Sequence, residues 1–413
     1  MHHIFLKYYL PSYKMLLKNK TIIFLGNARF DGNIKSTSFF IAQNLAKHNK
    51  VFFIDYPFTL KDCFTTSFDT KELKLRRRKF SLFSDGRLRT KIKNLEIIVT
   101  PPVLPINFMP EGTIFRRLLN FNQEIIARRV KKVLRAEKVS EFIYVNAFNF
   151  HYPDIAERIN PSLSVYQCVD PMIVPYDMKH GIYSEKQLVA KSDLVICTSK
   201  ALYLEKSTQN SNTFFIPNGT DLNPKGIGNV TFDRHDKLKS IPRPVIGYLG
   251  TIERRINFEL ITEVIMLNPD KSFVFAGPVS EGFVPEELYK LQNVRFLGTI
   301  SHQDVEQMIS SFDVAIIPFK KDDVSKTIFP IKLFEYLSAG KPVVATDFNE
   351  DLKDYTEDCV AYCRTATNFS YALNDMLQKD SEAEKQRRRQ LAQKNTWEVR
   401  ASQFAEILNS HLK

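Results

Sequence analysis

The chain has 413 residues, which exceeds one ordinary hydrophobic core and predicts two or three domains. A formal net charge of +12 and a pI near 9.2 predict attraction to phosphates or anionic surfaces, which a nucleotide ligand, nucleic acid or a lipid bilayer would each provide. No apolar stretch approaches the length of a membrane span, and the first 20 residues, interrupted by Lys7 and Pro11, make a poor signal peptide. The five cysteines are scattered and include no CxxC pair, so the sequence indicates neither a zinc site nor a disulfide framework and favours a reduced, cytosolic protein.

The first half of the chain shows the alternation of a parallel α/β sheet. Its short apolar runs, each followed by a polar loop, predict strands at 21–26, 51–56, 142–145, 164–169, 194–198 and 214–217. An amphipathic helix at 36–47 separates the first two strands, and this order is one βαβ unit. The loop at 27–33 is a weak phosphate fingerprint, because Gly26 and Gly32 lack a third glycine at the required spacing.

Two basic segments stand out in this half. Residues 71–93 carry ten lysines and arginines with interleaved phenylalanines, a composition that would suit an anionic leaflet, a lipid-linked pyrophosphate or nucleic acid, or simply a solvated loop or hairpin. Residues 113–138 follow a helical period, with apolar side chains on one side and basic side chains over much of the rest. The pair predicts a basic face on the first half of the chain.

Asp170 is the candidate catalytic residue of this half. It directly follows the strand predicted at 164–169, and ligand sites of parallel α/β sheets lie at the carboxyl ends of the strands. His151 occupies a comparable position in the loop after another strand. An aspartate at such a place also serves as a turn or cap residue, so position alone leaves both roles open.

A stretch rich in Gly, Asn, Lys and Pro at 221–244 predicts a linker, after which the alternation begins again. Strands are expected at 245–249, 273–276, 294–297, 314–318 and 343–346, with helices at 257–267, 302–311 and after Phe329. Residues 385–413 predict one or two helices that return to the first half. We therefore predict an N-terminal Rossmann-like domain (1–220), a linker (221–244), a second Rossmann-like domain (245–384) and C-terminal helices (385–413), with the two parallel sheets facing a central cleft.

A nucleotide site is predicted in the second half. Three strands end in glycine, at Gly250, Gly277 and Gly298, where the missing side chain lets a backbone approach a ligand. Lys332 and Glu335 are three residues apart on a proline-opened helix, so they share one face. This spacing alone is typical of a surface ion pair. The nearby glycines, Arg255 and the helix N-terminus instead favour a binding site for a nucleoside diphosphate.

The motifs in this order resemble those of GT-B glycosyltransferases, of the family 1/4-like type that includes polysaccharide and teichuronic-acid biosynthesis enzymes. The resemblance rests on the segments VYQCVD (165–170), KSDLVICTSKAL (191–202), IPNGTD (216–221), GYLGTIERRINFEL (247–260), FAGPV (275–279), NVRFLGTI (293–300), DVAIIPFK (313–320) and PIKLFEYLSAGKPVVAT (330–346). The first 150 residues match only in layout.

The resemblance implies a role for each matching residue. Glu335 would hold the donor ribose, Lys332 and Arg255 would face the diphosphate, and Gly250 and Gly277 would let the donor approach. The backbone from Gly298 through Thr299 to Ile300 would meet the base, and Asp170 would be the general base. Many relatives carry a glutamate eight residues before Glu335, where this chain has Thr327, so retention or inversion of the sugar configuration stays open.

The sequence thus predicts a metal-independent, hexosyltransferase-type enzyme that moves a sugar from a UDP- or GDP-sugar to a hydroxyl of a lipid-linked saccharide, with no further cofactor. It is expected to work in the cytoplasm, as a peripheral protein on the inner face of the cell membrane, in bacterial surface polysaccharide biosynthesis. Two alternatives remain: a nucleotide-sugar 2-epimerase of the same fold, and a non-catalytic module that binds anionic lipid or nucleic acid. The first would turn over donor without any acceptor.

Overall fold

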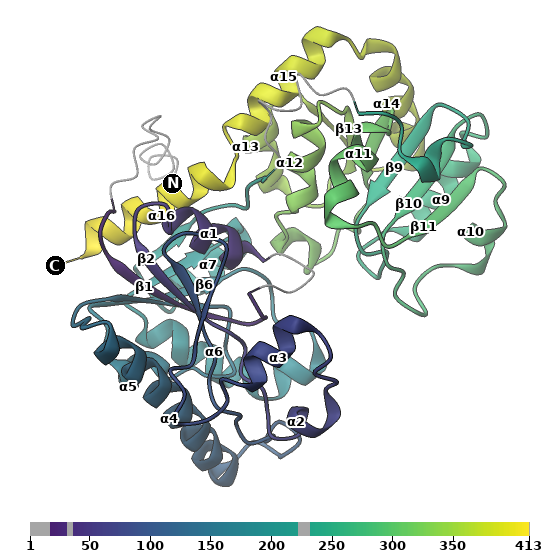
Figure 1. Ribbon diagram of the computed structural model, residues 1–413. Helices are drawn as coiled ribbons and strands as arrows, with labels where there is room; N and C mark the ends of the chain where they lie inside the picture. Colours follow the sequence, from purple (N-terminus) through teal and green to yellow (C-terminus); the bar gives the residue numbers. More distant parts are fainter. Residues whose placement is uncertain (1–16, 31–35, 222–231, 413) are drawn as a thin grey trace. The chain divides into compact units, whose positions relative to one another are not determined.

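The computed structural model describes residues 17–30, 36–221 and 232–412, and the chain divides into two compact units (Figure 1). The N-terminal unit comprises Met1–Pro217 and Glu398–Lys413, and the C-terminal unit comprises Asn218–Trp397. The predictions made for residues 1–16, 31–33 and 222–231 lie outside the described residues.

The N-terminal unit is built on an eight-stranded sheet with the order β3-β4-β2-β1-β5-β6-β7-β8. All neighbouring strands are parallel except β3, which runs antiparallel to β4. The strands are β1 (Thr21–Gly26), β2 (Lys50–Ile54), β3 (Arg87–Arg89), β4 (Leu95–Ile98), β5 (Ile143–Ala147), β6 (Leu163–Cys168), β7 (Leu194–Cys197) and β8 (Thr213–Phe215).

Helices connect these strands and cover the sheet. They are α1 (Thr37–Leu45), α2 (Asp62–Thr65), α3 (Lys71–Arg77), α4 (Thr113–Ala136), α5 (Ile155–Ile159), α6 (Pro175–Lys191) and α7 (Lys200–Ser207). Alternation along the strands separates the two faces: Ile23 and Leu25 of β1 pack with the buried side of α4, whereas Phe24 stacks on Phe53 of β2 on the other face. The N-terminal unit is therefore a three-layer α/β domain.

The last helix, α16 (Trp397–His411), groups with the N-terminal unit. Its Glu398 pairs with Lys47 at 3.1 Å, and the ring of His411 lies 5.3 Å from that of Phe214. The prediction that the C-terminal helix packs back on the first half is confirmed.

The C-terminal unit contains a six-stranded, fully parallel sheet with the order β11-β10-β9-β12-β13-β14. Its strands are β9 (Val245–Leu249), β10 (Ser272–Ala276), β11 (Val294–Gly298), β12 (Val314–Ile317), β13 (Val343–Thr346) and β14 (Val360–Cys363). Its helices are α9 (Phe258–Met266), α10 (Glu286–Lys290), α11 (Val305–Ser310), α12 (Ile331–Ser338), α13 (Lys353–Thr356), α14 (Ala366–Lys379) and α15 (Glu382–Gln393), and short 3-10 turns are η2 (Asp236–Leu238), η3 (His302–Asp304), η4 (Ser325–Thr327) and η5 (Glu350–Leu352). One continuous apolar core joins these elements.

The basic segment 71–93 differs from the predicted solvated loop or hairpin in its first third. Residues 71–77 form the helix α3, and Arg76 is buried there against Asp55, with Nε 2.7 Å from Oδ2. The hairpin part of the prediction holds further on, where β3 pairs with β4. Strands β4 and β14 were not predicted.

Within the described residues, no helix combines the length and the apolar character that crossing a bilayer requires. All five cysteines are free thiols.

Candidate functional site

The strand order of the C-terminal unit defines where its ligand site is expected. The chain leaves β9 toward β10 and β11 on one side, and returns to β12, β13 and β14 on the other. Parallel α/β sheets bind ligands outside the carboxyl ends of the strands at such a reversal of strand order. The loop after β9, which begins with Gly250, lies at this point.

Three glycines line adjacent strand ends here. Gly250 N–H donates to the carbonyl of Ala276 at 2.9 Å, and Gly277 N–H donates to the carbonyl of Gly298 at 2.8 Å. Gly250 and Gly277 have φ angles of +141° and +143°, and a Cβ on Gly277 would lie 2.1 Å from the carbonyl oxygen of Gly250. Any side chain at Gly277 would force the strand ends apart.

Lys332 approaches the same loop from helix α12. The helix begins after Pro330, as predicted, and Lys332 extends back from its first turn to the end of β9. Its Nζ donates to the hydroxyl of Tyr248 at 2.7 Å and lies 4.2 Å from the centre of the Tyr248 ring and 4.9 Å from that of Phe319. A Cβ on Gly250 would meet Nζ at 2.6 Å. Gly250 and Lys332, 82 positions apart in sequence, are therefore in direct contact.

The electrostatic state of Lys332 is unusual. The pKa of Lys332 is lowered from 10.5 to about 7, mainly because its ammonium group is buried. The nearby charge of Arg255 also lowers the pKa, whereas Glu335 and Glu253 oppose the shift. Part of the residue still reaches the surface. An anion bound beside this nitrogen would favour its protonated form, since opposite charge raises the pKa of a lysine.

Arg255 and Glu335 are the other two charged candidates near Lys332 and Gly250. Arg255 pairs with Glu253 through its Nε, and its guanidinium lies 5.7 Å from the centre of the Phe319 ring. Glu335, one helical turn after Lys332, is partly buried. The structure thus brings Gly250, Arg255 and Lys332 together as the sequence suggested.

Thr299 follows β11 directly and is exposed beside Gly298, at the outer edge of the same end of the sheet. Thr327, which stands where many relatives have a glutamate, is buried in η4, and its hydroxyl donates to the carbonyl of Val324 at 2.6 Å. Its hydroxyl is therefore engaged within its own turn.

The N-terminal unit carries the candidate base. Asp170 is exposed in the bend after β6, as its position in the sequence indicated. His151 lies after β5, with its Nε2 3.5 Å from Oδ1 of Asp177, a residue of α6 that sequence reasoning did not single out. A carboxylate can orient an imidazole for proton transfer.

Sequence reasoning missed the aromatic support of the site. Tyr248 and Phe319 lie within segments that carry the resemblance but were given no role there, yet their rings flank the Lys332 ammonium. Tyr336 contributes as well, because its hydroxyl accepts from Leu249 N–H at 2.8 Å and so ties α12 to β9. All five residues of β9 are buried, so no alternation along this strand marked Tyr248 as a site residue.

Across the described portion of the chain, no group of three or more His, Cys, Asp or Glu side chains is arranged to hold a metal ion. The residues that gather at the ends of β9 and β10 and the start of α12 are instead glycines, the cations Lys332 and Arg255, and the carboxylates Glu253 and Glu335. This set is suited to an anionic ligand.

Residues 243–379, from just before β9 to the end of α14, match the family described as Glycosyl transferases group 1. This segment is similar to the domains of that family. It contains all of the donor-side candidates, namely Gly250, Arg255, Gly277, Thr299, Lys332 and Glu335.

A curated glycosyltransferase is also similar to this chain. The chain is 27% identical over 252 residues to TuaH of Bacillus subtilis (strain 168), a glycosyltransferase named for teichuronic acid biosynthesis. The match covers 56% of this chain and 63% of TuaH, which is less than two thirds of that protein. The relationship is distant.

Solved structures show the fold over nearly the whole chain. Sucrose-phosphate synthase from Thermosynechococcus elongatus matches with a TM-score of 0.66 at 14% identity, covering 95% of this chain and 99% of that chain. Anabaena HepE, solved in complex with UDP, matches with a TM-score of 0.62 at 16% identity and covers 95% and 100%. The predicted fold class, GT-B, is confirmed.

Proposed function

We propose that the protein transfers a sugar from a UDP- or GDP-sugar to a hydroxyl of a saccharide acceptor. The observation that carries this proposal is the contact of the Lys332 ammonium with Gly250 at the reversal of strand order, inside the segment that matches the group 1 glycosyltransferases. The structural neighbour HepE has been solved in complex with UDP and with UDP-glucose, which supports a uridine diphosphate donor.

On the donor side, Lys332 and Arg255 bind the diphosphate, and the N-terminus of α12 adds its dipole. Gly250 and Gly277 leave room for the phosphates at the strand ends. Glu335 accepts hydrogen bonds from the ribose hydroxyls, and the backbone around Thr299 meets the base.

The reaction breaks the bond between the anomeric carbon and the diphosphate oxygen, and forms a bond from that carbon to the acceptor oxygen. The electron pair of the broken bond stays on the leaving diphosphate, whose added charge Lys332 and Arg255 stabilise without a metal. The proton of the acceptor hydroxyl passes to Asp170, acting as general base. His151 is a second candidate for this role, because its contact with Asp177 would orient the ring.

The acceptor we propose is a lipid-linked saccharide of a bacterial surface polysaccharide, and the location is the cytoplasmic face of the cell membrane. The name of TuaH supports a polysaccharide acceptor. The net charge of +12 supports association with an anionic leaflet.

A thermal-shift screen of nucleotide sugars and free nucleotides tests the donor assignment. A bound donor raises the unfolding temperature, because it binds only the folded state. We expect UDP-sugars or GDP-sugars to raise it and ATP to leave it unchanged. If no nucleotide sugar gives a shift, the proposal is wrong.

Release of UDP or GDP on addition of saccharide acceptors then tests transfer. Release that depends on acceptor supports transfer to a hydroxyl. Conversion of the donor to a second nucleotide sugar in the absence of any acceptor would identify an epimerase instead.

A further inference from the structure

The outer face of helix α4 combines positive charge with exposed apolar side chains. Residues on this face recur at helical spacing, all exposed: Ile114, Arg117, Phe121, Arg128, Lys132 and Arg135. Glu124 lies on the same face and pairs with Arg128 at 2.8 Å, which leaves Arg117, Lys132 and Arg135 as the cations of the stripe without a carboxylate partner among the ion pairs of the described residues. The opposite face packs into the core through Phe115, Leu119, Ile126, Val130 and Val133. At about 1.5 Å per residue, the stripe from Ile114 to Arg135 is roughly 30 Å long.

The loop between α3 and β3 adds two more apolar side chains beside this stripe. Leu82 and Phe83, at its tip, are 69% and 94% exposed. The Lys132 ammonium donates to the carbonyls of Leu82 and of Phe83, at 3.0 Å each. The tip therefore lies against the C-terminal half of the α4 stripe.

Several side chains hold this loop in one shape. Arg129, buried on α4, donates to the carbonyl of Ser84 at 2.7 Å, to that of Ser81 at 2.6 Å and to that of Lys79 at 3.3 Å. A Cβ on Gly86, whose φ is +68°, would lie 2.2 Å from the Arg129 guanidinium, so the glycine is needed for this close approach. The two apolar side chains are thus exposed by a well-anchored loop.

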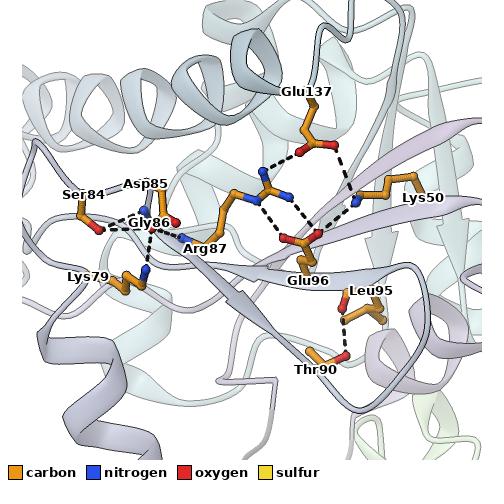
Figure 2. Close-up of polar contacts among 10 residues, drawn as sticks. All are labelled: Lys50, Lys79, Ser84, Asp85, Gly86, Arg87, Thr90, Leu95, Glu96 and Glu137. Carbon is orange, nitrogen blue, oxygen red and sulfur yellow. Dashed lines mark hydrogen bonds and ion pairs between the residues drawn. The ribbon is translucent and has the colours of Figure 1, made fainter.

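Ion pairs fix the base of the loop, as Figure 2 shows. Lys79 pairs with Asp85 at 2.6 Å across the loop. Arg87, the first residue of β3, makes two hydrogen bonds to Glu96 of β4, and Glu137 after α4 also pairs with Arg87 and Lys50. These contacts tie the loop to both the sheet and α4.

We propose that the outer face of α4 and the Leu82–Phe83 tip form the surface by which the protein docks on an anionic lipid bilayer. Helices that lie in a membrane interface combine basic side chains with large apolar ones, and here the cations are flanked by Ile114 and Phe121 on one side and by the tip on the other. Lysines and arginines meet the lipid phosphates, while Leu82 and Phe83 enter the acyl boundary. The inference rests on the proposed location at the membrane and identifies the residues that produce it.

Lipid suits this surface better than nucleic acid does. Nucleic-acid sites place aromatic rings where bases can stack, but two of the four apolar side chains here, Leu82 and Ile114, are aliphatic. A bilayer accepts aliphatic and aromatic side chains equally. The rigid tip also fits insertion, since its side chains need no rearrangement to leave water.

The test is flotation of the full chain with vesicles of phosphatidylcholine alone or with 30% phosphatidylglycerol. Two surface variants, Leu82→Ser with Phe83→Ser and Arg117→Glu with Arg135→Glu, are compared with two controls on the C-terminal unit. The controls are Tyr371→Ser, a similarly exposed ring, and Lys290→Glu with Lys394→Glu, an equal change of charge. Unfolding temperatures, with and without UDP-glucose, are measured for all proteins.

We expect the wild type and both controls to float with the anionic vesicles, and each surface variant to bind them at least tenfold more weakly. All five proteins should keep the same unfolding temperature and the same shift with UDP-glucose. The inference is overturned if the wild type does not float, if the surface variants float as well as the controls, or if the wild type binds RNA but no vesicle. The UDP-glucose shift reports on the proposed donor site independently of each of these outcomes.

Discussion

The ammonium group of Lys332 donates a hydrogen bond to the hydroxyl of Tyr248 at 2.7 Å and lies 4.2 Å above the same ring. The contact joins the first turn of α12 to the end of β9. Burial of the ammonium group, together with the nearby charge of Arg255, lowers the pKa of Lys332 to about 7. The proposed donor site therefore holds a cation that is only about half protonated at neutral pH until an anion arrives.

Replacing Lys332 by methionine should stabilise the protein without ligand. Between pH 7 and 10.5 the unfolded chain holds a proton on this lysine that the folded chain does not, so wild-type stability rises with pH over that window. The gain from Lys332→Met should be roughly 2–4 kcal/mol at pH 7 and should shrink toward pH 10. Urea unfolding at pH 7 and pH 9.5 measures it. If Lys332→Met is less stable than the wild type at pH 7, the buried ammonium of Lys332 does not destabilise the folded protein, and this prediction is wrong.

Gly250→Ala should weaken donor binding. The new Cβ would lie 2.6 Å from the Lys332 Nζ, and the backbone φ of +141° disfavours any side chain, at a cost of about 1–2 kcal/mol. We expect at least a tenfold loss of UDP-glucose affinity by calorimetry. Gly282→Ala is the matched control, because Gly282 also has a positive φ but has no atom within 4 Å of the added Cβ. Equal loss of affinity in both variants would argue against a special role for Gly250.

Glu335→Gln should also weaken donor binding, because Glu335 is proposed to accept hydrogen bonds from the ribose hydroxyls. A hydrogen bond to a charged group contributes about 1.5–3 kcal/mol, so an affinity loss of roughly tenfold or more is expected. Glu263→Gln, on the exposed side of α9, serves as control and should bind as wild type does. The comparison should use UDP-glucose and free uracil, because only the former carries a ribose. If Glu335→Gln binds UDP-glucose as tightly as the wild type does, Glu335 does not contact the donor.

Arg76→Met should destabilise the N-terminal unit. Arg76 and Asp55 are 1% and 2% exposed, and removing one partner leaves a buried charge, which costs about 3–5 kcal/mol. The neighbouring Arg78→Met removes an exposed arginine from the same segment and should change the free energy of unfolding by less than about 0.5 kcal/mol. Urea unfolding of the two variants gives the comparison. Similar values for both would mean that the Arg76 pair contributes little.

Much of the fold could be predicted from the sequence because most strands of both sheets are short apolar runs bounded by polar loops. Strand β4 escaped prediction, since its apolar residues merge into the proline-rich stretch that follows. Strand β14 escaped as well, because Val360–Cys363 is short and half exposed. The buried ion pair of Arg76 could not be predicted, because Arg76 lies in a run of basic residues and its partner Asp55 lies 21 residues earlier.

The donor-side residues could be found from glycine-ended strands and the spacing of Lys332 and Glu335. The burial of Lys332 could not be predicted from the sequence, because it depends on the rings of Tyr248 and Phe319, which belong to two other segments of the chain. Likewise, nothing in the sequence indicated that Arg129 and Lys132 hold the loop whose tip is Leu82 and Phe83. Contacts between distant segments set both features.

The most direct test of the central claim, that Lys332 binds the donor diphosphate, is calorimetric titration of UDP-glucose from pH 6 to pH 9. Since the free lysine has a pKa near 7 and must be protonated beside the diphosphate, we predict that affinity falls by about tenfold per pH unit above pH 7. Binding should take up close to one proton there, and Lys332→Met should lose both the affinity and its pH dependence. An affinity that is constant from pH 6 to pH 9, with no proton uptake, would contradict the account.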